Sequence, residues 1–234
     1  MKAMILAAGL GTRLLPHTRQ RPKPLFPVLN RPLLHLTVNR LREAGFAEIV
    51  VNAHHLREQI KRSLAGYAAI IVQEEEEILG TGGGLQRALS HFNRDPVLVV
   101  NGDIYHSIDY REVCRFHRQA GADVTLVLHD WARFNSVTVD EAMHITGFRG
   151  NSAGSQPGER TLAFTGIHVI NPAVLATIPP GVNSSIIACY EKLLRESATV
   201  QAFLATGHYW TDMGTPADYL ALHEGLLTGS VPVY

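Results

Sequence analysis

The stretch MKAMILAAGLGTRLLPHTRQRPKPLFPV, Met1 to Val28, opens the chain and decides its fold. Its apolar run Met4 to Ala8 is too short for an ordinary helix and is followed by glycine, so it predicts a buried strand at the centre of a parallel sheet. The strand leads into the loop Gly9-Leu10-Gly11-Thr12-Arg13, where two glycines precede a hydroxyl and a cation. The chain therefore begins with a strand and a glycine-rich loop.

This loop has the chemistry of a polyphosphate site. Glycines let main-chain N–H groups approach an anion closely. Arg13 and Lys23 add positive charge, and two prolines restrict the backbone around Lys23. A dinucleotide fingerprint would need glycine in place of Leu14, and a Walker A loop would need Gly-Lys-Ser/Thr after four intervening residues. Neither motif fits, so we expect a triphosphate site of another kind, with a plain tight turn as the alternative.

The opening resembles the signature of the sugar-1-phosphate nucleotidylyltransferases, also called NDP-sugar pyrophosphorylases. The resemblance rests on residues 7–14 together with Pro16, Thr18, Pro22-Lys23-Pro24 and Pro27-Val28. It implies that Arg13 and Lys23 are catalytic. It also implies nucleotide binding by Leu6, Ala7, Ala8, Gly9, Gly11, Thr12, Arg13 and Lys23.

Composition narrows the function classes. The 234 residues suit one sizeable domain with a buried core, and 46% of them are hydrophobic. Lys+Arg and Asp+Glu are both 21, so no net charge favours nucleic acid or a membrane surface as a partner. Cys114 and Cys189 show no zinc or disulfide spacing and are expected as free thiols. The start lacks a long apolar region, which favours a cytoplasmic protein.

Strand and helix patterns alternate after the first loop. The predicted helices are 32–45, 56–64, 85–92, 110–120, 184–197 and 217–227, and the predicted strands are 48–52, 68–72, 96–100, 123–129, 162–170 and 199–205. The alternation predicts an α/β fold, a Rossmann-like mostly parallel sheet flanked by helices. We expect a single nucleotidyltransferase domain over 1–234, with residues 1–130 binding the nucleotide and 131–234 forming the sugar-binding part.

Two polar stretches invite a metal or binding interpretation. His54 and His55 follow the second predicted strand, but no other ligand lies at a suitable spacing, so turn residues are favoured. Residues 74–77 are four successive glutamates, and most of them are expected to lie on a solvent-exposed loop.

Gly80-Thr81-Gly82-Gly83-Gly84 opens the helix that follows these glutamates. Consecutive glycines would let a flat base lie against the backbone, with N–H groups reading its edge. The family resemblance places the nucleobase here, and Thr81, Gly82 and Gly83 are therefore expected to bind it; a flexible hinge is the alternative. The three glycines look most like the N-acetylmuramate-1-phosphate uridylyltransferases and some guanylyl-transferring relatives.

Asn101-Gly102-Asp103 follows the apolar strand 96–100. Open α/β sheets bind ligands at the carboxyl ends of their strands, and Mg²⁺ takes one or two carboxylates together with phosphates and water. Asp103 is therefore a candidate Mg²⁺ ligand, as the family resemblance also implies, and Asn101 a candidate sugar contact; a turn or helix cap is the alternative for Asp103. Asp109 is expected to cap the helix 110–120.

From residue 131 the segments shorten and alternate, which predicts a small strand-rich flap over the sheet that recognises the sugar. Asn135 is a candidate sugar contact or a turn asparagine. Thr165 and Gly166 interrupt a strand, and a glycine there indicates a bulge or close approach of a ligand. Several relatives carry a Glu-Lys pair before this strand, and this chain has Gly158-Glu159-Arg160-Thr161, so the sugar is left open.

Trp210-Thr211-Asp212-Met213-Gly214-Thr215-Pro216 matches the family's second metal-binding motif, which makes Asp212 the other Mg²⁺ ligand, with a turn or cap as the alternative. The resemblance implies that a sugar-1-phosphate oxygen attacks the α-phosphorus of a nucleoside triphosphate and releases pyrophosphate. UTP with N-acetylmuramate 1-phosphate, for cell-wall recycling, is the first expectation, and guanylyl transfer to mannose- or heptose-1-phosphate is the second. A catalytically silent nucleotide-sugar-binding homologue is the alternative from another class.

A monomer or a homo-oligomer is expected, with small molecules as partners.

Overall fold

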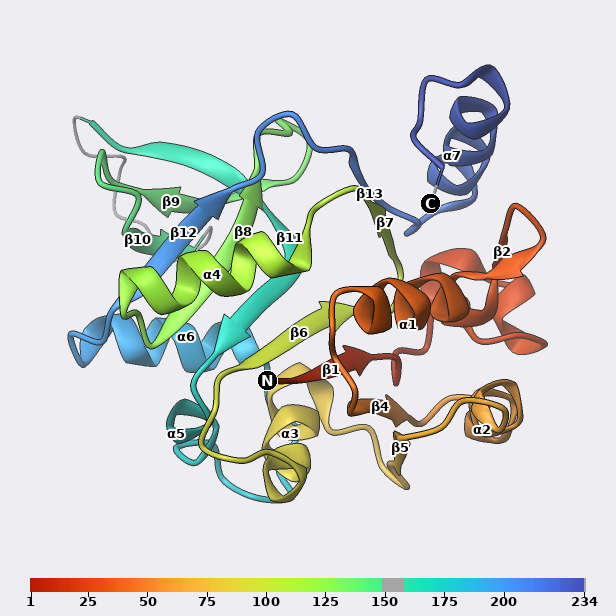
Figure 1. Ribbon diagram of the computed structural model, residues 1–234, viewed down its shortest axis with the longest axis horizontal. Coiled ribbons are helices and arrows are strands. Elements are labelled where there is room, and N and C mark those ends of the chain that lie inside the picture. Colours follow the sequence, from red (N-terminus) through yellow and green to blue (C-terminus); the bar gives the residue numbers. More distant parts are fainter. Residues whose placement is uncertain (149–157, 234) are drawn as a thin grey trace.

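The computed structural model describes residues 1–148 and 158–233 and is built around one large sheet (Figure 1). Its centre is parallel, in the order β5-β4-β1-β6. The bounds are Lys2–Leu6 for β1, Ile49–Ala53 for β4, Ile70–Glu74 for β5 and Val97–Asn101 for β6. The N-terminal strand thus occupies the interior of the sheet, as its uninterrupted apolar run predicts.

The remaining strands extend this sheet through β11, Arg160–Ile170, which runs antiparallel to β6. Its second half pairs with β6 and its first half with β9, while β8 lies on its other side. The further strands are β8 Val124–His129, β9 Asn135–Val139, β10 Ile145–Phe148 and β12 Val200–Leu204. The predicted flap therefore differs from expectation, because β9 and β10 continue the sheet at its edge and do not lie over it.

Helices cover both faces of the sheet, because buried strands present apolar side chains to both sides. Ala3 and Ile5 face one helical layer, and Met4 faces the other. In Figure 1 α1 and α4 lie in front of the strands. The first layer contains α1 Leu33–Glu43, α2 Arg57–Leu64 and α4 Tyr110–Ala120, and the second contains α3 Gly80–Arg87, α5 Pro172–Leu175 and α6 Ile186–Arg195. This arrangement confirms the predicted α/β class.

Short elements complete the side of the molecule that carries the first loop. The last helix, α7 Pro216–Thr228, packs with the first loop and α1 in a third apolar cluster that includes Leu14, Leu33 and Leu222. The two-stranded pairs are β2 Pro27–Val28 with β3 Arg31–Pro32, and β7 Ile104–His106 with β13 Trp210–Asp212. The first loop is therefore braced by the far C-terminal part of the chain.

Predictions that rest on a few neighbouring residues, such as a helix cap or a turn, are confirmed. Asp109 caps α4 by accepting a hydrogen bond from the Arg111 N–H at 2.8 Å. His54 and His55 contact main-chain carbonyls of Glu75 and Thr18, which fits turn residues. The two cysteines are free. Across the described part of the chain, no helix combines the length and the apolar character needed to cross a bilayer. The Gly/Ser-rich stretch 150–158 of the sequence lies almost entirely outside the described residues.

A buried histidine provides a test of this core. Both ring nitrogens of His168 lack a hydrogen-bond partner among the described residues, and burial lowers the pKa of His168 from 6.5 to about 3. Below pH 6.5 the unfolded chain therefore binds a proton that the folded protein does not, so this residue lowers the free energy of unfolding as the pH falls.

We predict that His168→Leu reduces the slope of unfolding free energy against pH by about 1 kcal/mol per pH unit between pH 6 and 4.5. Urea denaturation at several pH values measures this slope. His106 and His117, whose pKa values are also lowered by burial, remain in both proteins and cancel in the difference. Equal slopes for the two proteins would contradict the prediction.

Candidate active site

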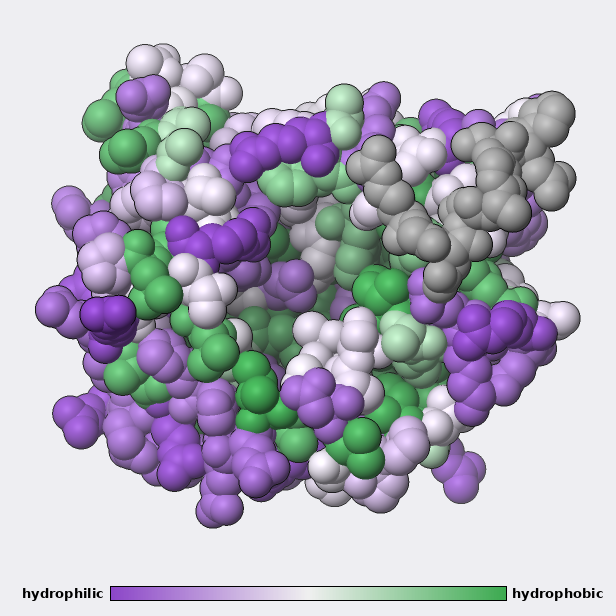
Figure 2. Space-filling model, turned by 180° about the vertical axis from the view of Figure 1, so that it is seen from behind, coloured by the Kyte–Doolittle hydropathy of each residue, from purple (hydrophilic) through white to green (hydrophobic). Residues whose placement is uncertain are grey.

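A cleft of about 350 Å³ opens at the carboxyl ends of β1 and β6, the edge where parallel sheets bind their ligands. Figure 2 shows this face of the molecule hollowed near its centre. The cleft is lined by Leu6, Ala7, Ala8, Gly9, Gly11, Thr12, Arg13, Lys23, Pro24, Asn52, Ile78, Gly80, Thr81, Asn101, Asp103 and Gly214. All eight residues of the first segment that were expected to bind nucleotide lie in this lining.

The first loop is shaped to receive an anion. Gly11 has φ 63°, and a Cβ there would lie 2.8 Å from the Thr18 methyl, so glycine is required by both conformation and space. The Thr18 hydroxyl donates to the Gly11 carbonyl at 3.1 Å and fixes the loop. Within the described chain, the N–H groups of residues 8–13 donate to no protein acceptor. They are therefore available to phosphate oxygens, as in other backbone anion sites.

Four charged side chains meet at one end of the cleft. Lys23 Nζ lies 2.5 Å from Asp103 Oδ2 and 3.1 Å from Asp212 Oδ1. Arg13 Nη2 lies 3.1 Å from the other Asp212 oxygen. The Lys23 side chain is 7% exposed, whereas that of Arg13 is 58% exposed. The four residues predicted to be catalytic are thus brought together, with the lysine held inside and the arginine open to the cleft.

Strand pairing explains why the two aspartates converge. Asp103 lies in the short connection between β6 and β7, and Asp212 ends β13. The antiparallel β7–β13 pair places Asp212 opposite Ile104, and the Met213 N–H donates to the Asp103 carbonyl at 3.0 Å. Gly214 leaves room for the Arg13 guanidinium, because a Cβ at Gly214 would overlap Arg13 Nη1. Two aspartates from distant parts of the sequence therefore share one carboxylate site.

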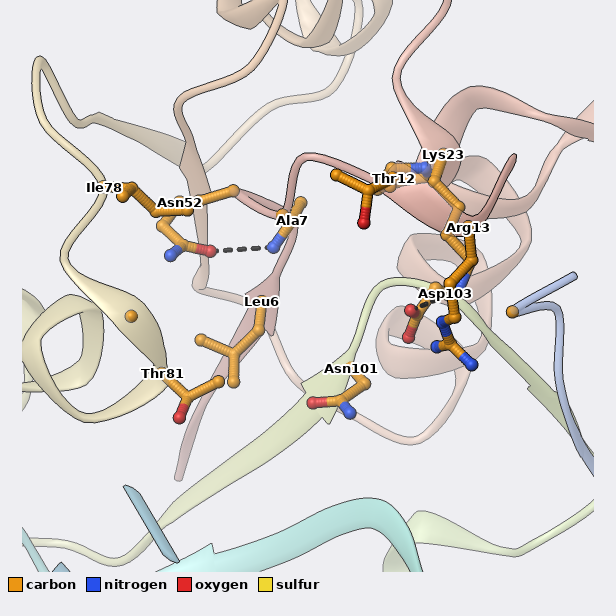
Figure 3. Close-up of a pocket in the computed structure, with 16 residues that line it drawn as sticks. Leu6, Ala7, Thr12, Arg13, Lys23, Asn52, Ile78, Thr81, Asn101 and Asp103 are labelled. Carbon is orange, nitrogen blue, oxygen red and sulfur yellow. Dashed lines mark hydrogen bonds and ion pairs between the residues drawn. The ribbon is translucent and has the colours of Figure 1, made fainter. Parts of the chain in front are cut away.

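The other end of the cleft is uncharged. Figure 3 places Asn52, Ile78 and Thr81 at one side of the close-up and Arg13 and Asp103 at the opposite side. Asn52 lies on the strand beside β1, and its Oδ1 accepts a hydrogen bond from the Ala7 N–H at 2.8 Å. A ligand with a polyanionic part and a neutral part, such as a nucleoside triphosphate, matches this division of the cleft.

Gly82 and Gly83 require a correction, because the structure does not place them in the cleft. Both N–H groups donate to the Ser184 carbonyl, at 2.8 and 3.4 Å, and a Cβ at Gly83 would overlap the Val182 carbonyl oxygen. These glycines let α3 pack against the segment that leads into α6. Thr81 does line the cleft, although its hydroxyl also accepts the Ile186 N–H at 2.9 Å. The glycine run is therefore mainly a helix-packing feature.

Three of the four expected sugar contacts have other partners. Asn135 accepts from the Trp131 N–H at 3.1 Å, which fits the turn alternative. The Thr165 hydroxyl is buried and donates to the Val127 carbonyl at 2.8 Å. Gly166 marks a β11 irregularity with φ 81°, and a Cβ there would lie 2.5 Å from Asn101 Nδ2. The close approach predicted at Gly166 is thus made by a protein side chain, and Asn101 is the expected sugar contact that lines the cleft.

Sequence reasoning missed several residues of the cleft. Asn52 lies near the end of a strand that neighbours β1, and that position was the available signal, since parallel strands end at the same ligand edge. Outside the lining, Glu75 is fully buried whereas Glu76 and Glu77 are exposed, so the solvated interpretation holds for most of the glutamate run but not for Glu75. The remaining missed lining residues are Pro24, Ile78, Gly80 and Gly214.

A further ion pair lies close to the charged end. Arg133 Nη1 contacts Asp218 Oδ1 at 2.5 Å and joins the loop after β8 to α7. Burial opposes ionisation of Asp218, but hydrogen bonds from Arg133 and Thr215 outweigh it and lower the pKa of Asp218. The hydrogen bond with Asp218 raises the pKa of Arg133, to which Asp212 also contributes. The Arg133 guanidinium is therefore a further positive charge that interacts with Asp212.

The donor set at the charged end fits a hard divalent cation. Asp103 and Asp212 both reach one ammonium group, so they can also reach one metal ion in its place. The described residues contain no cluster of three or more His, Cys, Asp or Glu side chains suited to a metal. Two carboxylates with the remaining positions left for phosphate and water is the pattern that Mg²⁺ favours. The site thus suits Mg²⁺ that arrives together with a phosphate ligand.

The fold and the site together define an α/β protein whose cleft, at the carboxyl edge of its sheet, has the chemistry of a polyphosphate site. The Nucleotidyl transferase family model matches residues 2–229, and the chain belongs to this family.

Relatives with assigned names support the same family. The chain is 30% identical to a mannose-1-phosphate guanylyltransferase of Mycobacterium tuberculosis over 98% of its length, and 29% identical to a UTP--glucose-1-phosphate uridylyltransferase of Synechocystis over 99%. It spans 66% and 64% of those two proteins. The crystal structure of HddC from Yersinia pseudotuberculosis matches with 25% identity and a TM-score of 0.79, covering 96% of this chain and 99% of that one.

We predict that Lys23→Met strengthens divalent-cation binding in the absence of nucleotide. Removing one positive charge that lies 2.5 Å from Asp103 and 3.1 Å from Asp212 should increase Mn²⁺ affinity at least tenfold, since such a charge opposes a cation by more than about 1.4 kcal/mol. Electron paramagnetic resonance of Mn²⁺ measures the bound fraction. The control Lys23→Met/Asp103→Asn should lose the gain. Equal Mn²⁺ affinity of the wild type and Lys23→Met would show that the two aspartates do not form a cation site.

Proposed function

We propose that this protein transfers a nucleotidyl group from a nucleoside triphosphate to a sugar 1-phosphate and releases pyrophosphate. The observation that carries the proposal is the convergence of Arg13, Lys23, Asp103 and Asp212 beside a loop with free main-chain N–H groups. Membership of the Nucleotidyl transferase family supports it.

The chemical problem is electrostatic. Both reactants are anions, and the sugar phosphate is already ionised at neutral pH, so the reaction needs positioning and charge neutralisation more than a general base. The N–H groups of the first loop would hold the triphosphate. The exposed Arg13 would stabilise the departing pyrophosphate, and Lys23 would contact the α-phosphate and the incoming sugar phosphate.

Asp103 and Asp212 would hold Mg²⁺, which when bound supplies charge neutralisation of the phosphates. In the absence of ligand their charge is balanced by Lys23 and Arg13. The Lys23 ammonium has three N–H donors, and its two carboxylate contacts leave one donor for a phosphate. The same ammonium can then serve the substrate.

The identity of the base and the sugar forms a finer proposal. The three glycines of the sequence resemble those of N-acetylmuramate-1-phosphate uridylyltransferases and of some guanylyl-transferring relatives. The first resemblance supports UTP and N-acetylmuramate 1-phosphate, which would place the protein in cell-wall recycling in the cytoplasm. The guanylyl alternative, with mannose- or heptose-1-phosphate, has equal support, because the relatives include mannose-1-phosphate guanylyltransferases as well as a uridylyltransferase. We retain both pairs as specific proposals, with small molecules as the partners.

We predict pyrophosphate release with Mg²⁺ from one nucleotide and one sugar 1-phosphate. The panel is UTP, dTTP, GTP, CTP and ATP against N-acetylmuramate, mannose, heptose and glucose 1-phosphates. Turnover with UTP would favour the uridylyl proposal, and turnover with GTP would favour the guanylyl proposal. Turnover with dTTP, CTP or ATP alone would contradict both specific proposals. Nucleotide-sugar binding without any turnover would instead support a silent regulatory homologue.

We further predict that Asp103→Asn and Lys23→Ala each lower kcat by a factor of about 10² to 10³, because each removes a fixed charge from the reacting phosphates. Steady-state kinetics measures the loss, and circular dichroism checks that the fold remains. The matched control is Asp109→Asn, which keeps a helix-capping side chain outside the cleft and should leave kcat unchanged. Near-normal kcat in either cleft variant would refute these assignments.

A further inference from the structure

Glu75 is a buried carboxylate without a cationic partner. It is fully buried, and no lysine, arginine or histidine of the described chain forms an ion pair with its side chain. Burying a charge is costly unless hydrogen bonds compensate for the lost water. Oε1 accepts from Asn52 Nδ2 at 2.8 Å, and Oε2 accepts from the Leu79 N–H at 3.2 Å. Gln73 Nε2 lies 3.4 Å from Oε1.

These contacts fix the orientation of the Asn52 amide. Its oxygen accepts the Ala7 N–H, as the dashed line in Figure 3 shows, and its nitrogen donates to Glu75. A rotated amide would place a donor against the Ala7 N–H and an acceptor against the carboxylate. Because Glu75 accepts through both oxygens, from Asn52 and from the Leu79 N–H, the Asn52 nitrogen is held on the side away from Ala7.

Helix α3 encloses the same pair. A Cβ at Gly84 would lie 2.8 Å from Asn52 Nδ2 and 2.9 Å from Glu75 Oε1, so the helix can approach only because residue 84 is glycine. Gln73 also ties the strand β5 to the Gly84 carbonyl at 2.9 Å. The orientation of Asn52 is therefore set by packing as well as by hydrogen bonding.

Asn52 lines the uncharged end of the cleft, and its amide nitrogen carries a second hydrogen for which the described chain offers no acceptor. We propose that Asn52 donates this hydrogen to an exocyclic carbonyl oxygen of the nucleobase, and that Glu75 is a positioning residue that holds it there. The inference rests on the proposed function, because it assumes a nucleotide in the cleft. The oxygen concerned is O6 of guanine or O4 of uracil and thymine, so the contact favours these keto bases over adenine and cytosine, whose amino group at the same ring position would face another donor.

Two variants separate this role from plain structural support. In Glu75→Gln the new amide can accept from only one of Asn52 and Leu79, so one of these donors loses its partner. In Asn52→Asp/Glu75→Gln, the carboxylate introduced at position 52 would accept from both the Ala7 N–H and the new amide, and the glutamine oxygen would accept from Leu79. The double variant restores these internal hydrogen bonds but presents an acceptor to the base.

The experiment is calorimetric binding of GTP, UTP, ATP and CTP without a sugar phosphate, together with the melting temperature of each protein. Wild type should bind GTP or UTP at least about tenfold more tightly than ATP and CTP, which corresponds to about 1.4 kcal/mol. Glu75→Gln should lower both the melting temperature and the affinity for the keto nucleotide, the latter by about tenfold. The double variant should regain the melting temperature without the keto preference. Exposed Glu76→Gln is the matched control and should match wild type.

Four outcomes would overturn the inference. A double variant that regains both the melting temperature and the keto preference would show that Asn52 only supports the fold. Unchanged keto affinity in Glu75→Gln would remove its positioning role. Wild-type protein that binds all four nucleotides equally would reject the base contact alone, whereas wild-type protein that binds none of them would reject the proposed function as well.

Discussion

The ammonium of Lys23 is the contact on which the candidate site depends. It holds two carboxylates, Asp103 and Asp212, that approach it from separate parts of the chain. Two like charges at such short range would repel each other without it. Because this lysine is almost fully buried, its position is set by the short helical turn around Pro22 and Pro24 and not by a flexible side chain at the surface. The first loop and the β7–β13 pair therefore form one unit.

The central sheet positions the first loop and the β7–β13 pair. β1 lies between two parallel strands, and its carboxyl end opens into the loop that offers free N–H groups. Charge is concentrated on the side of β6 and β13, while the side of β4 and α3 is neutral and partly apolar. A single cleft thus offers different chemistry to the two ends of a ligand. The buried Glu75 lies behind the lining at this end, where it accepts hydrogen bonds from Asn52 and the Leu79 N–H.

Local sequence patterns were sufficient to predict the fold class and the segment that forms the first loop of the cleft. The apolar run of β1 and the strand and helix alternation predicted the α/β class, and the spacing of Gly11, Arg13 and Lys23 predicted an anion site in the loop that lines the cleft. Prediction failed where a polar or small residue had more than one possible partner. Gly82 and Gly83 have the composition of a nucleotide loop, yet they serve helix packing against residues 182–185. Thr165 was likewise expected to bind a ligand, but its hydroxyl donates to the Val127 carbonyl beside the bulge in β11.

The sequence by itself determined which segments become buried strands and helices, because hydrophobic period and glycine or proline breaks act over a few residues. It also determined the chemical type of the first loop. The tertiary structure alone decided that Asp103 meets Asp212, that Asn101 lies against Gly166, and that Glu75 is buried while Glu76 is exposed. These outcomes depend on which strands pair and which helix packs over them. Side-chain type does not specify a partner that is distant in the sequence, and burial and hydrogen bonding select that partner only once the sheet has formed.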